Sequence, residues 1–364
     1  MNTRNEEPPT SAQLMQQYRQ EEDSDYVATL LVLFIEQSPG LRFHSIEHPF
    51  PNGAKPDVAC EYLAMDGGVV FEIKAKREMN SVIEYEADQI AKQIIRYSTT
   101  LNGWSTRLED QKGFCDVIEI VNSSDVRQFE SEITSRFGSL EPAAPRPRQD
   151  GLAFLGWERT EVLPCDEMKI RFFSGAVTDS TLLAPFREFN GFLAPLYRIV
   201  TEKNNRNIHL EIQSEHRLIV AMMEKIWGIY DFRTGLIADR ELPGDASKDY
   251  FVKDGKIYFT IECLDVHFHW VPSGRAYCAK VKRDRLKTTC EKMCKLGFLD
   301  KEEVTDKTYY GMSLNRKGHD YLSDVCDEYA EMLEHQHDLE EAKKREMASR
   351  MQRSLDEFSN PHGQ

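Results

Sequence analysis

Long apolar runs are scarce in this chain of 364 residues. The run at residues 26–35 is too short to span a bilayer. The amino end, residues 1–13, is polar and carries no secretory signal. None of the eight cysteines belongs to a C-x-x-C pair. These absences exclude a membrane protein and a disulfide-stabilised secreted protein, and they predict a cytoplasmic protein with reduced thiols.

An excess of positive charge is also missing. The chain has 46 basic and 61 acidic side chains, a net charge of −15. This balance argues against binding nucleic acid through overall charge. Binding depends on the local patch, however, so the charge of each region decides the question.

The most informative stretch lies between residues 56 and 74. Residues 58–62 predict a short strand, Asp66-Gly67-Gly68 a tight turn, and residues 69–73 a second strand. Such a hairpin brings Asp57 back beside Glu72, and alternation puts Glu72 and Lys74 on one face. Two carboxylates and an ammonium in one place are the parts of a Mg²⁺ site that cleaves phosphodiesters.

The surrounding segments predict helices on both sides of this hairpin. Residues 26–35 follow Ser24-Asp25, a good N-cap pair, and form a buried first helix. Residues 82–97 form an amphipathic helix that carries Gln93 and Tyr97 on one face. A strand at residues 115–121 and a helix at residues 125–137 follow.

Together these residues resemble the PD-(D/E)XK, or restriction-endonuclease-like, nuclease superfamily. Pro56-Asp57 matches the "PD", Glu72-Ile73-Lys74 matches the "(D/E)XK", and Gln93-x-x-x-Tyr97 resembles the third motif of the RecB-like branch. The resemblance implies an α/β fold, a mixed β-sheet flanked by helices.

The resemblance also implies a role for each motif residue. Asp57, Glu72 and the carbonyl of Ile73 would hold Mg²⁺, with Mn²⁺ as a substitute. Lys74 would orient or activate the attacking water, and Gln93 with Tyr97 would position the DNA strand. Whether a first-helix carboxylate, Glu22 or Asp25, joins the metal stays open. Lys76 and Arg77 are either contacts to DNA phosphates or a polar strand end.

The rest of the first half predicts more strands and a domain boundary. Strands are expected at residues 152–157 and 168–173, a helix at 182–200, and a polar linker at 202–207. The predicted domains are a disordered amino end (1–20), a nuclease-like domain (21–203), a winged-helix domain (208–320) and a carboxy-terminal helix (321–358).

The second half resembles a winged-helix domain of the bacterial and archaeal regulator type. A helix at 216–229, a strand pair at 256–263 and 266–270, and a helix at 283–296 are followed by a hairpin at 298–314. The hairpin would be the wing.

Charge in this region favours DNA contact. From Arg275 to Lys317 there are twelve basic and six acidic side chains, a net +6 inside an acidic protein. We expect phosphate contacts from four residues, which we call the basic patch: Lys282, Arg283, Arg285 and Lys287. The alternative is that the winged helix serves dimerisation or protein binding.

The cysteines and histidines of this half, among them Cys263, His267 and His269, are spaced too widely for structural zinc. The closely spaced cysteine set of iron–sulfur relatives is also missing. We therefore expect buried thiols, with no zinc and no cluster.

Residues 321–358 predict a long helix without glycine or proline. Apolar residues follow an a/d spacing up to Leu339. This helix either pairs with its copy in a homodimer or lies back on its own domain.

The expected function is a Mg²⁺-dependent DNA nuclease, endo- or exonucleolytic, positioned by the winged helix in a restriction, repair, defence or mobile-element context. The alternative is a winged-helix regulator or a defence-complex subunit whose nuclease-like domain is catalytically silent. The expected partners are DNA and a second copy of the chain, without a membrane.

Overall fold

The computed structural model describes most of the chain. The described residues are 7–47, 50, 55–65, 67–74, 83–100, 114–139, 150–206, 210, 212, 214–231, 236–237, 250–269, 281–304, 306–314 and 321–359. None of the helices within these ranges combines the length and the hydropathy of a bilayer-spanning segment. The fold class is α/β, as predicted, with a seven-stranded mixed sheet.

The chain divides into two compact units. The seven-stranded unit comprises Arg19–Ile212 and His269–Val281, and the four-stranded unit comprises Met1–Tyr18, Gln213–Phe268 and Lys282–Gln364. Each unit is assembled from separate stretches of chain, whereas the predicted domains are continuous. The predicted boundaries at residues 203 and 208 stay predictions.

The central sheet of the seven-stranded unit keeps its strands in chain order from β1 to β7. β4 runs parallel to both β3 and β5, and all other neighbours are antiparallel. The strands are β1 (Leu41–Ile46), β2 (Val58–Tyr62), β3 (Gly67–Ile73), β4 (Phe114–Asn122), β5 (Leu152–Thr160), β6 (Glu167–Ala176) and β7 (Phe192–Pro195).

The predicted hairpin at residues 58–73 is confirmed as β2 and β3. Val58 pairs with Phe71 and Cys60 with Val69. Gly67 begins β3 directly beside the Phe114 ring, where a Cβ would lie 2.7 Å from ring carbons. The glycine is therefore required by close packing between β3 and β4.

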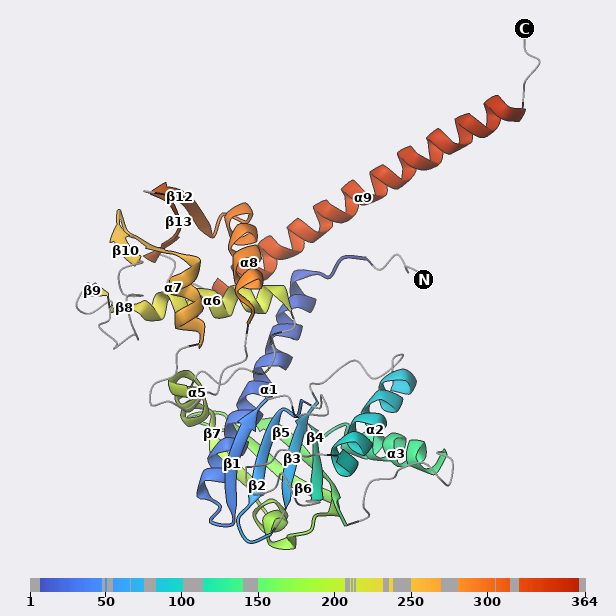
Figure 1. The fold of residues 1–364 in the computed structure, drawn as a ribbon, viewed down its shortest axis with the longest axis vertical. Helices are drawn as coiled ribbons and strands as arrows, with labels where there is room; N and C mark the ends of the chain where they lie inside the picture. The colour runs from blue at the N-terminus through green and yellow to red at the C-terminus, as the bar shows by residue number, and fades with distance from the viewer. Residues whose placement is uncertain are drawn as a thin grey trace. The chain divides into compact units, whose positions relative to one another are not determined.

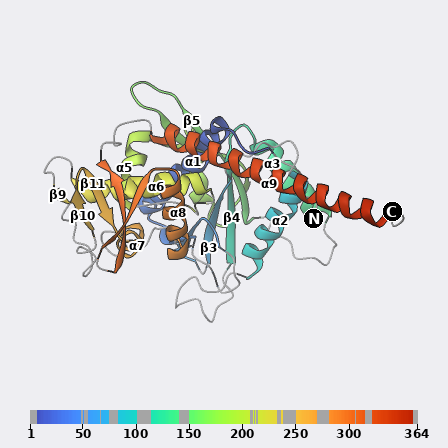
Figure 2. The same ribbon diagram turned by 90° about the horizontal axis from the view of Figure 1, so that it is seen from above.

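Two helices cover one face of this sheet (Figure 1). α2 (Ile83–Thr100) connects β3 to β4, and α3 (Val126–Ser139) connects β4 to β5. Crossovers between parallel strands are right-handed, so two successive crossovers in one direction leave both helices on the same face. A core cluster joins α2 to this face of β4 and β5 through Ile94, Val117 and Phe154. Figure 2 shows α2 and α3 beside β4 from a second direction.

α1 (Ser11–Gln37) packs in a different core cluster. Its residues Tyr26 to Ile35 are buried with Val69, Phe71 and Ile118, whose side chains alternate with those facing α2. The helix begins at Ser11, well before the expected start at residue 26, so the predicted disorder of residues 1–20 is wrong for residues 11–20. Ser24 and Asp25 therefore lie inside the helix, and their predicted role as an N-cap pair is wrong.

The single helix predicted at residues 182–200 is also wrong. The segment forms a 3₁₀ turn, a short helix, strand β7 and then a second helix. Gly191 has a φ of 64°, which suits glycine, and Pro195 ends β7 at the edge of the sheet. The helical pieces are η1 (Ser180–Leu183), α4 (Ala184–Arg187) and α5 (Leu196–Arg206).

The four-stranded unit contains an antiparallel sheet in the order β10-β11-β13-β12 and a separate two-stranded pair, β8 with β9. The predicted hairpin at 298–314 is confirmed as β12 and β13. Its helices are α6 (Glu215–Ile229), α7 (Ile261–His269), α8 (Arg283–Lys295) and α9 (Tyr321–Ser359). Its strands are β8 (Tyr230–Asp231), β9 (Leu236–Ile237), β10 (Tyr250–Lys253), β11 (Lys256–Phe259), β12 (Leu299–Val304) and β13 (Lys307–Ser313).

One strand prediction in this unit is wrong. Residues 261–269 form α7, whereas the sequence predicted a strand at 266–270. The hydroxyl of Thr260 accepts a hydrogen bond from the backbone N–H of Cys263 at 3.2 Å, which caps the helix. The strand partners of β11 are instead β10, which lies before it in the chain, and β13.

Candidate active site

The β2–β3 hairpin brings Asp57 to the end of β3. Its Oδ2 accepts a hydrogen bond from the backbone N–H of Ile73 at 2.6 Å. Val58 pairs with Phe71, so Asp57 and Glu72 are the next residues on the two strands, and the Glu72 charge acts on Asp57. The predicted approach of the two acids is therefore confirmed.

Glu72 is buried, and both of its carboxylate oxygens are hydrogen-bonded. The Tyr97 hydroxyl donates to Oε1 at 2.5 Å, and the Lys74 ammonium donates to Oε2 at 3.1 Å. Lys74 lies two residues along from Glu72, so its side chain is on the same face, as predicted.

Helix α2 completes a closed ring of hydrogen bonds. Gln93 and Tyr97 are one helical turn apart, and the Gln93 amide donates to the Tyr97 hydroxyl at 2.7 Å. The carbonyl oxygen of Gln93 accepts from the Lys74 ammonium at 3.4 Å. The ring thus runs through Glu72, Lys74, Gln93 and Tyr97, and each member constrains two others.

A further acid on β4, Glu119, lies beside this ring. It pairs in register with Glu72 across the parallel β3 and β4 strands. Its Oε2 is 3.9 Å from the Lys74 Nζ, and its side chain is fully buried. The sequence did not single out this residue. The sequence could have pointed to Glu119 in one way. It is a single acid on the face of an otherwise apolar strand that also carries Val117 and Val121.

The charges in this cluster influence one another strongly. Burial raises the pKa of Asp57 well above its ordinary value, and Glu72 raises it further, against the opposing effects of Lys74 and the Ile73 N–H. Burial alone would lower the pKa of Lys74, but Glu72, Glu119 and Asp57 outweigh it and raise that pKa. Lys74 is therefore an ammonium, a hydrogen-bond donor, at neutral pH.

Two other groups of the cluster have raised pKa values. Burial raises the pKa of Glu119 to about 8, with Lys74 lowering it and Glu72 raising it. Burial and the neighbouring Glu72 carboxylate raise the pKa of the Tyr97 phenol, so Tyr97 remains a protonated donor.

The oxygen donors at this site suit a hard cation. Within the described ranges, no group of three or more His, Cys, Asp or Glu side chains is arranged to hold a metal. Mg²⁺ needs fewer protein ligands, since it is usually bound by one or two carboxylates, retained waters and substrate oxygens. The Asp57 and Glu72 carboxylates fit this requirement, and the resemblance implies the Ile73 carbonyl as a third oxygen.

The remaining predicted residues lie elsewhere or outside the described residues. Lys76 and Arg77 fall in residues 75–82, which the structure does not describe. The Asp25 carboxylate accepts a hydrogen bond from the Leu210 N–H at 2.9 Å, which occupies one of its oxygens. Glu22 is half-buried on α1. The basic patch lies in the four-stranded unit.

Comparison with known proteins gave no significant match. No family model matches the chain, and neither a curated protein nor a solved structure resembles it closely enough to count. The functional assignment therefore depends on the side-chain geometry.

Proposed function

We propose that this protein is a Mg²⁺-dependent nuclease of the PD-(D/E)XK type that hydrolyses phosphodiester bonds in DNA. The observation that carries the proposal is the closed ring of Glu72, Lys74, Gln93 and Tyr97, with Asp57 opposite Glu72. A solvated surface hairpin has no reason to bury a glutamate and tie it to a lysine and to a helix.

The electrostatics of the cluster fit a divalent cation. The Glu72 carboxylate disfavours the ionised form of Asp57, whose pKa is raised. A cation beside Asp57 would favour its ionised form. When bound, Mg²⁺ would activate a water molecule and offset the charge that develops on the phosphate.

The protein groups would orient the reacting atoms. Lys74 would act as a donor to the attacking water or to a phosphate oxygen, because its neighbouring carboxylates keep it protonated. Tyr97 would hold Glu72 in place, and Gln93 would hold both Tyr97 and Lys74. In this role Lys74 orients the water and does not remove its proton.

The four-stranded unit is proposed to be a winged helix that binds DNA. Helix α8 directly precedes the β12–β13 hairpin, which is where the resemblance puts the wing. Lys282, Arg283 and Lys287 are exposed, and Arg285 is half-buried. Arg283 forms an ion pair with Glu262, so its charge is partly neutralised.

A charge-matched pair of variants tests this DNA contact. Replacing Lys282, Arg285 and Lys287 by Gln should weaken binding to unrelated sequences and flatten the salt dependence by about two to three units. The control replaces Lys253, Lys256 and Lys301 by Gln; these lysines pair with Glu302, Asp300 and Glu291, respectively. Equal effects of the two triple variants would contradict a specific basic patch.

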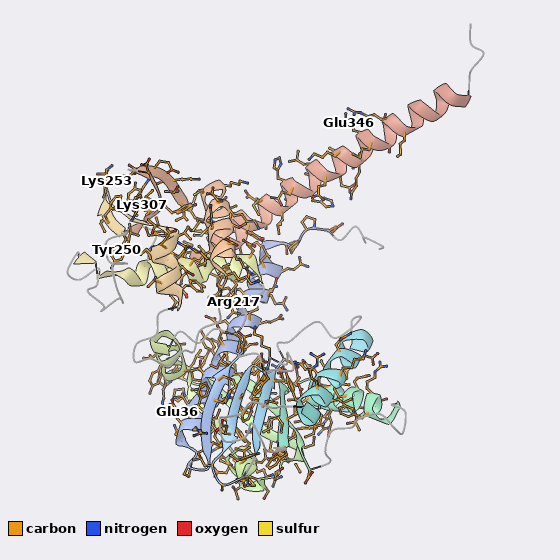
Figure 3. All side chains as sticks on the ribbon, viewed as in Figure 1. Glu36, Arg217, Tyr250, Lys253, Lys307 and Glu346 are labelled. Carbon is orange, nitrogen blue, oxygen red and sulfur yellow. The ribbon has the colours of Figure 1, made fainter. Side chains whose placement is uncertain are left out.

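A homodimer through α9 is a further part of the proposal. Beyond residue 341 the side chains of α9 described by the structure are exposed, and exposed apolar residues remain there, including Met347 and Met351. Figure 3 labels Glu346 on this part of the helix, where side chains project on all sides. Sedimentation equilibrium of the full chain, and of a variant with both methionines changed to Gln, tests whether this face holds a second copy.

Free thiols support a reducing compartment such as the cytoplasm. None of the cysteines that the structure describes forms a disulfide, and Cys60, Cys115, Cys263, Cys290 and Cys326 are buried.

The decisive experiment is DNA cleavage by the purified full chain. Linear duplex, circular duplex and single-stranded DNA are incubated with Mg²⁺ or with EDTA, and Lys74→Ala is the matched control. Metal-dependent cleavage that Lys74→Ala lacks supports the nuclease and separates endo- from exonucleolytic action. A gel shift without cleavage would instead favour a DNA-binding regulator with a silent site. Equal cleavage by Lys74→Ala would overturn the site assignment.

A further inference from the structure

Glu119 is a buried acid without a hydrogen bond. Its side chain is fully buried on β4, and neither carboxylate oxygen has a hydrogen-bond partner among the described residues. Its neighbours on the same face of β4 are Val117 and Val121, and Phe154 faces it on β5. Burying such a group costs stability, so its presence calls for a reason beyond packing.

The cation nearest to Glu119 is the Lys74 ammonium, and one of its three N–H donors forms no hydrogen bond with a described residue. An ammonium carries three N–H donors. Lys74 uses one for Glu72 at 3.1 Å and one for Gln93 at 3.4 Å. The Glu119 Oε2 is 3.9 Å from the same nitrogen, which is ion-pair distance and slightly too long for a hydrogen bond.

Glu72 has two competing tasks in the proposed nuclease. Its Oε2 is the principal acceptor for Lys74, yet a cation bound between Asp57 and Glu72 needs the same carboxylate. If Glu72 held the cation through Oε2, Lys74 would lose its closest partner. Among the described side chains, Glu119 is the other acidic residue within 4 Å of this ammonium, and its carboxyl oxygen can accept a hydrogen bond whether or not it is ionised.

We propose that Glu119 is a positioning residue for Lys74, which holds the ammonium in place when Glu72 is occupied by the cation. The inference rests on the proposed nuclease function. Glu119 itself touches neither the metal nor the substrate, and it acts through Lys74.

Glu119→Leu is the most informative variant. Leucine has a similar volume and removes a buried, unsatisfied carboxyl group, so Tm should rise by about 2–6 °C. The kcat for DNA cleavage should fall by at least about tenfold with little change in KM, because Lys74 is misplaced while DNA binding is intact. Glu119→Gln keeps an acceptor and should retain most of the kcat. A Leu variant with the kcat of the parent, or a Gln variant as slow as the Leu variant, would overturn the proposal.

Asp116→Asn is the matched control on the same strand. Asp116 is equally buried, but it faces the other side of the sheet and accepts hydrogen bonds from Tyr62 and Thr178. Its loss should lower Tm and leave the kcat of the folded protein unchanged. If Glu119→Leu and Asp116→Asn lowered kcat equally, the loss would come from disturbing β4 in general, and the proposal would fail.

A measurement without DNA separates this proposal from the nuclease function. The rate at which an amine-reactive acylating reagent modifies Lys74 is followed by mass spectrometry in the full chain. Glu72→Ala imitates the withdrawal of Glu72. Lys74 should be modified severalfold faster in Glu72→Ala/Glu119→Leu than in either single variant.

Equal rates in the double and single variants would refute the role of Glu119, whether or not the protein cleaves DNA. Faster modification in a protein that shows no cleavage would instead uphold Glu119 as the partner of Lys74 and refute the nuclease.

Discussion

The two faces of strand β4 each bury one acid, but only one of these acids has hydrogen-bond partners. Asp116 faces the α1 side, where Tyr62 and the backbone and hydroxyl of Thr178 donate to it at 2.7–2.9 Å. Glu119 faces the α2 side, where its oxygens have no hydrogen-bond partner among the described residues. A fully hydrogen-bonded carboxyl group and one without a hydrogen bond are therefore only three positions apart on the same strand.

The contrast shows which face is organised for stability. On the α1 side, Asp116 ties β2, β4 and the segment after β6 together, since Tyr62 and Thr178 come from those elements. On the α2 side, three acids gather around one ammonium at a cost in free energy. Unfavourable burial of this kind is typical of sites organised for binding or catalysis.

The largest expected effect is on the α2 side. Asp57→Asn or Lys74→Ala should lower metal-dependent cleavage by about 10²- to 10⁴-fold, because each removes a group that holds the cation or orients the water. Cleavage rates and circular dichroism on the same preparations check this. A variant with native circular dichroism and unreduced cleavage would place catalysis elsewhere.

The pH dependence of the free energy of unfolding should reveal the raised pKa of Glu119. Its pKa is raised to about 8 in the folded protein from 4.5, so the folded state binds more protons than the unfolded state between these values. The free energy of unfolding therefore falls as pH rises through this window, by about 2 kcal/mol between about pH 5 and 7 for this one group.

Urea unfolding of the parent and of Glu119→Leu in EDTA measures this slope. The Leu variant should lose less stability than the parent as pH rises. If the free energy of unfolding changed with pH equally in both proteins, the pKa of Glu119 would not be raised. The contrast between Glu119 and Asp116 would then lose its electrostatic evidence.

Two tyrosines give a matched test of the contrast. Tyr62 donates to Asp116 at 2.7 Å, and Tyr97 donates to Glu72 at 2.5 Å. Tyr62→Phe should lower the free energy of unfolding by about 1–2 kcal/mol and leave cleavage unchanged. Tyr97→Phe should lower cleavage by about tenfold, since Glu72 loses the donor that orients it. Loss of cleavage in both variants would show that the α1 side of the sheet is needed for cleavage as much as the α2 side.

The smallest expected effect belongs to Gln93. Its contact with Lys74 is long, at 3.4 Å, and its side chain is half-exposed. Gln93→Leu should lower kcat by about threefold or less, corresponding to a weak hydrogen bond. Steady-state kinetics measures this. A loss as large as that of Lys74→Ala would show that Gln93 contacts the DNA strand directly.

The hairpin site was predictable because its signals are local. The two short strands and the alternation of Glu72 with Lys74 are properties of adjacent residues. The turn predicted at residues 66–68 is wrong, however, because Gly67 and Gly68 belong to β3 and Gly68 pairs with Glu61. Gln93 and Tyr97 were predictable for the same reason, since a helical turn brings them together. Glu119 was not predictable in this way. Its position beside Glu72 depends on the crossover through α2, which no local pattern encodes.

The wrong predictions arose where a local pattern fits two structures. Residues 266–270 alternate apolar and polar side chains, yet the Thr260 cap and the length of the segment favour helix α7. The segment at 182–200 has helical composition, but it supplies the edge strand β7 because β6 offers backbone groups to pair with. A local cap decides the first case, and pairing with β6 overrides local propensity in the second.

The first helix has a consequence for anyone who expresses the protein in pieces. Ser11 donates a hydrogen bond to Asp327, and the Asp25 carboxylate accepts one from Leu210. Both partners lie beyond residues 202–207, where the sequence predicts a linker and would suggest dividing the chain. That prediction is wrong up to Arg206, because these residues belong to α5. A fragment ending there would retain α1 without either contact, and the complementary fragment would lack the first 18 residues of its own compact unit. Separate halves are therefore expected to be less stable than the same parts in the intact chain, and co-expression of both fragments is the sounder route to a split protein.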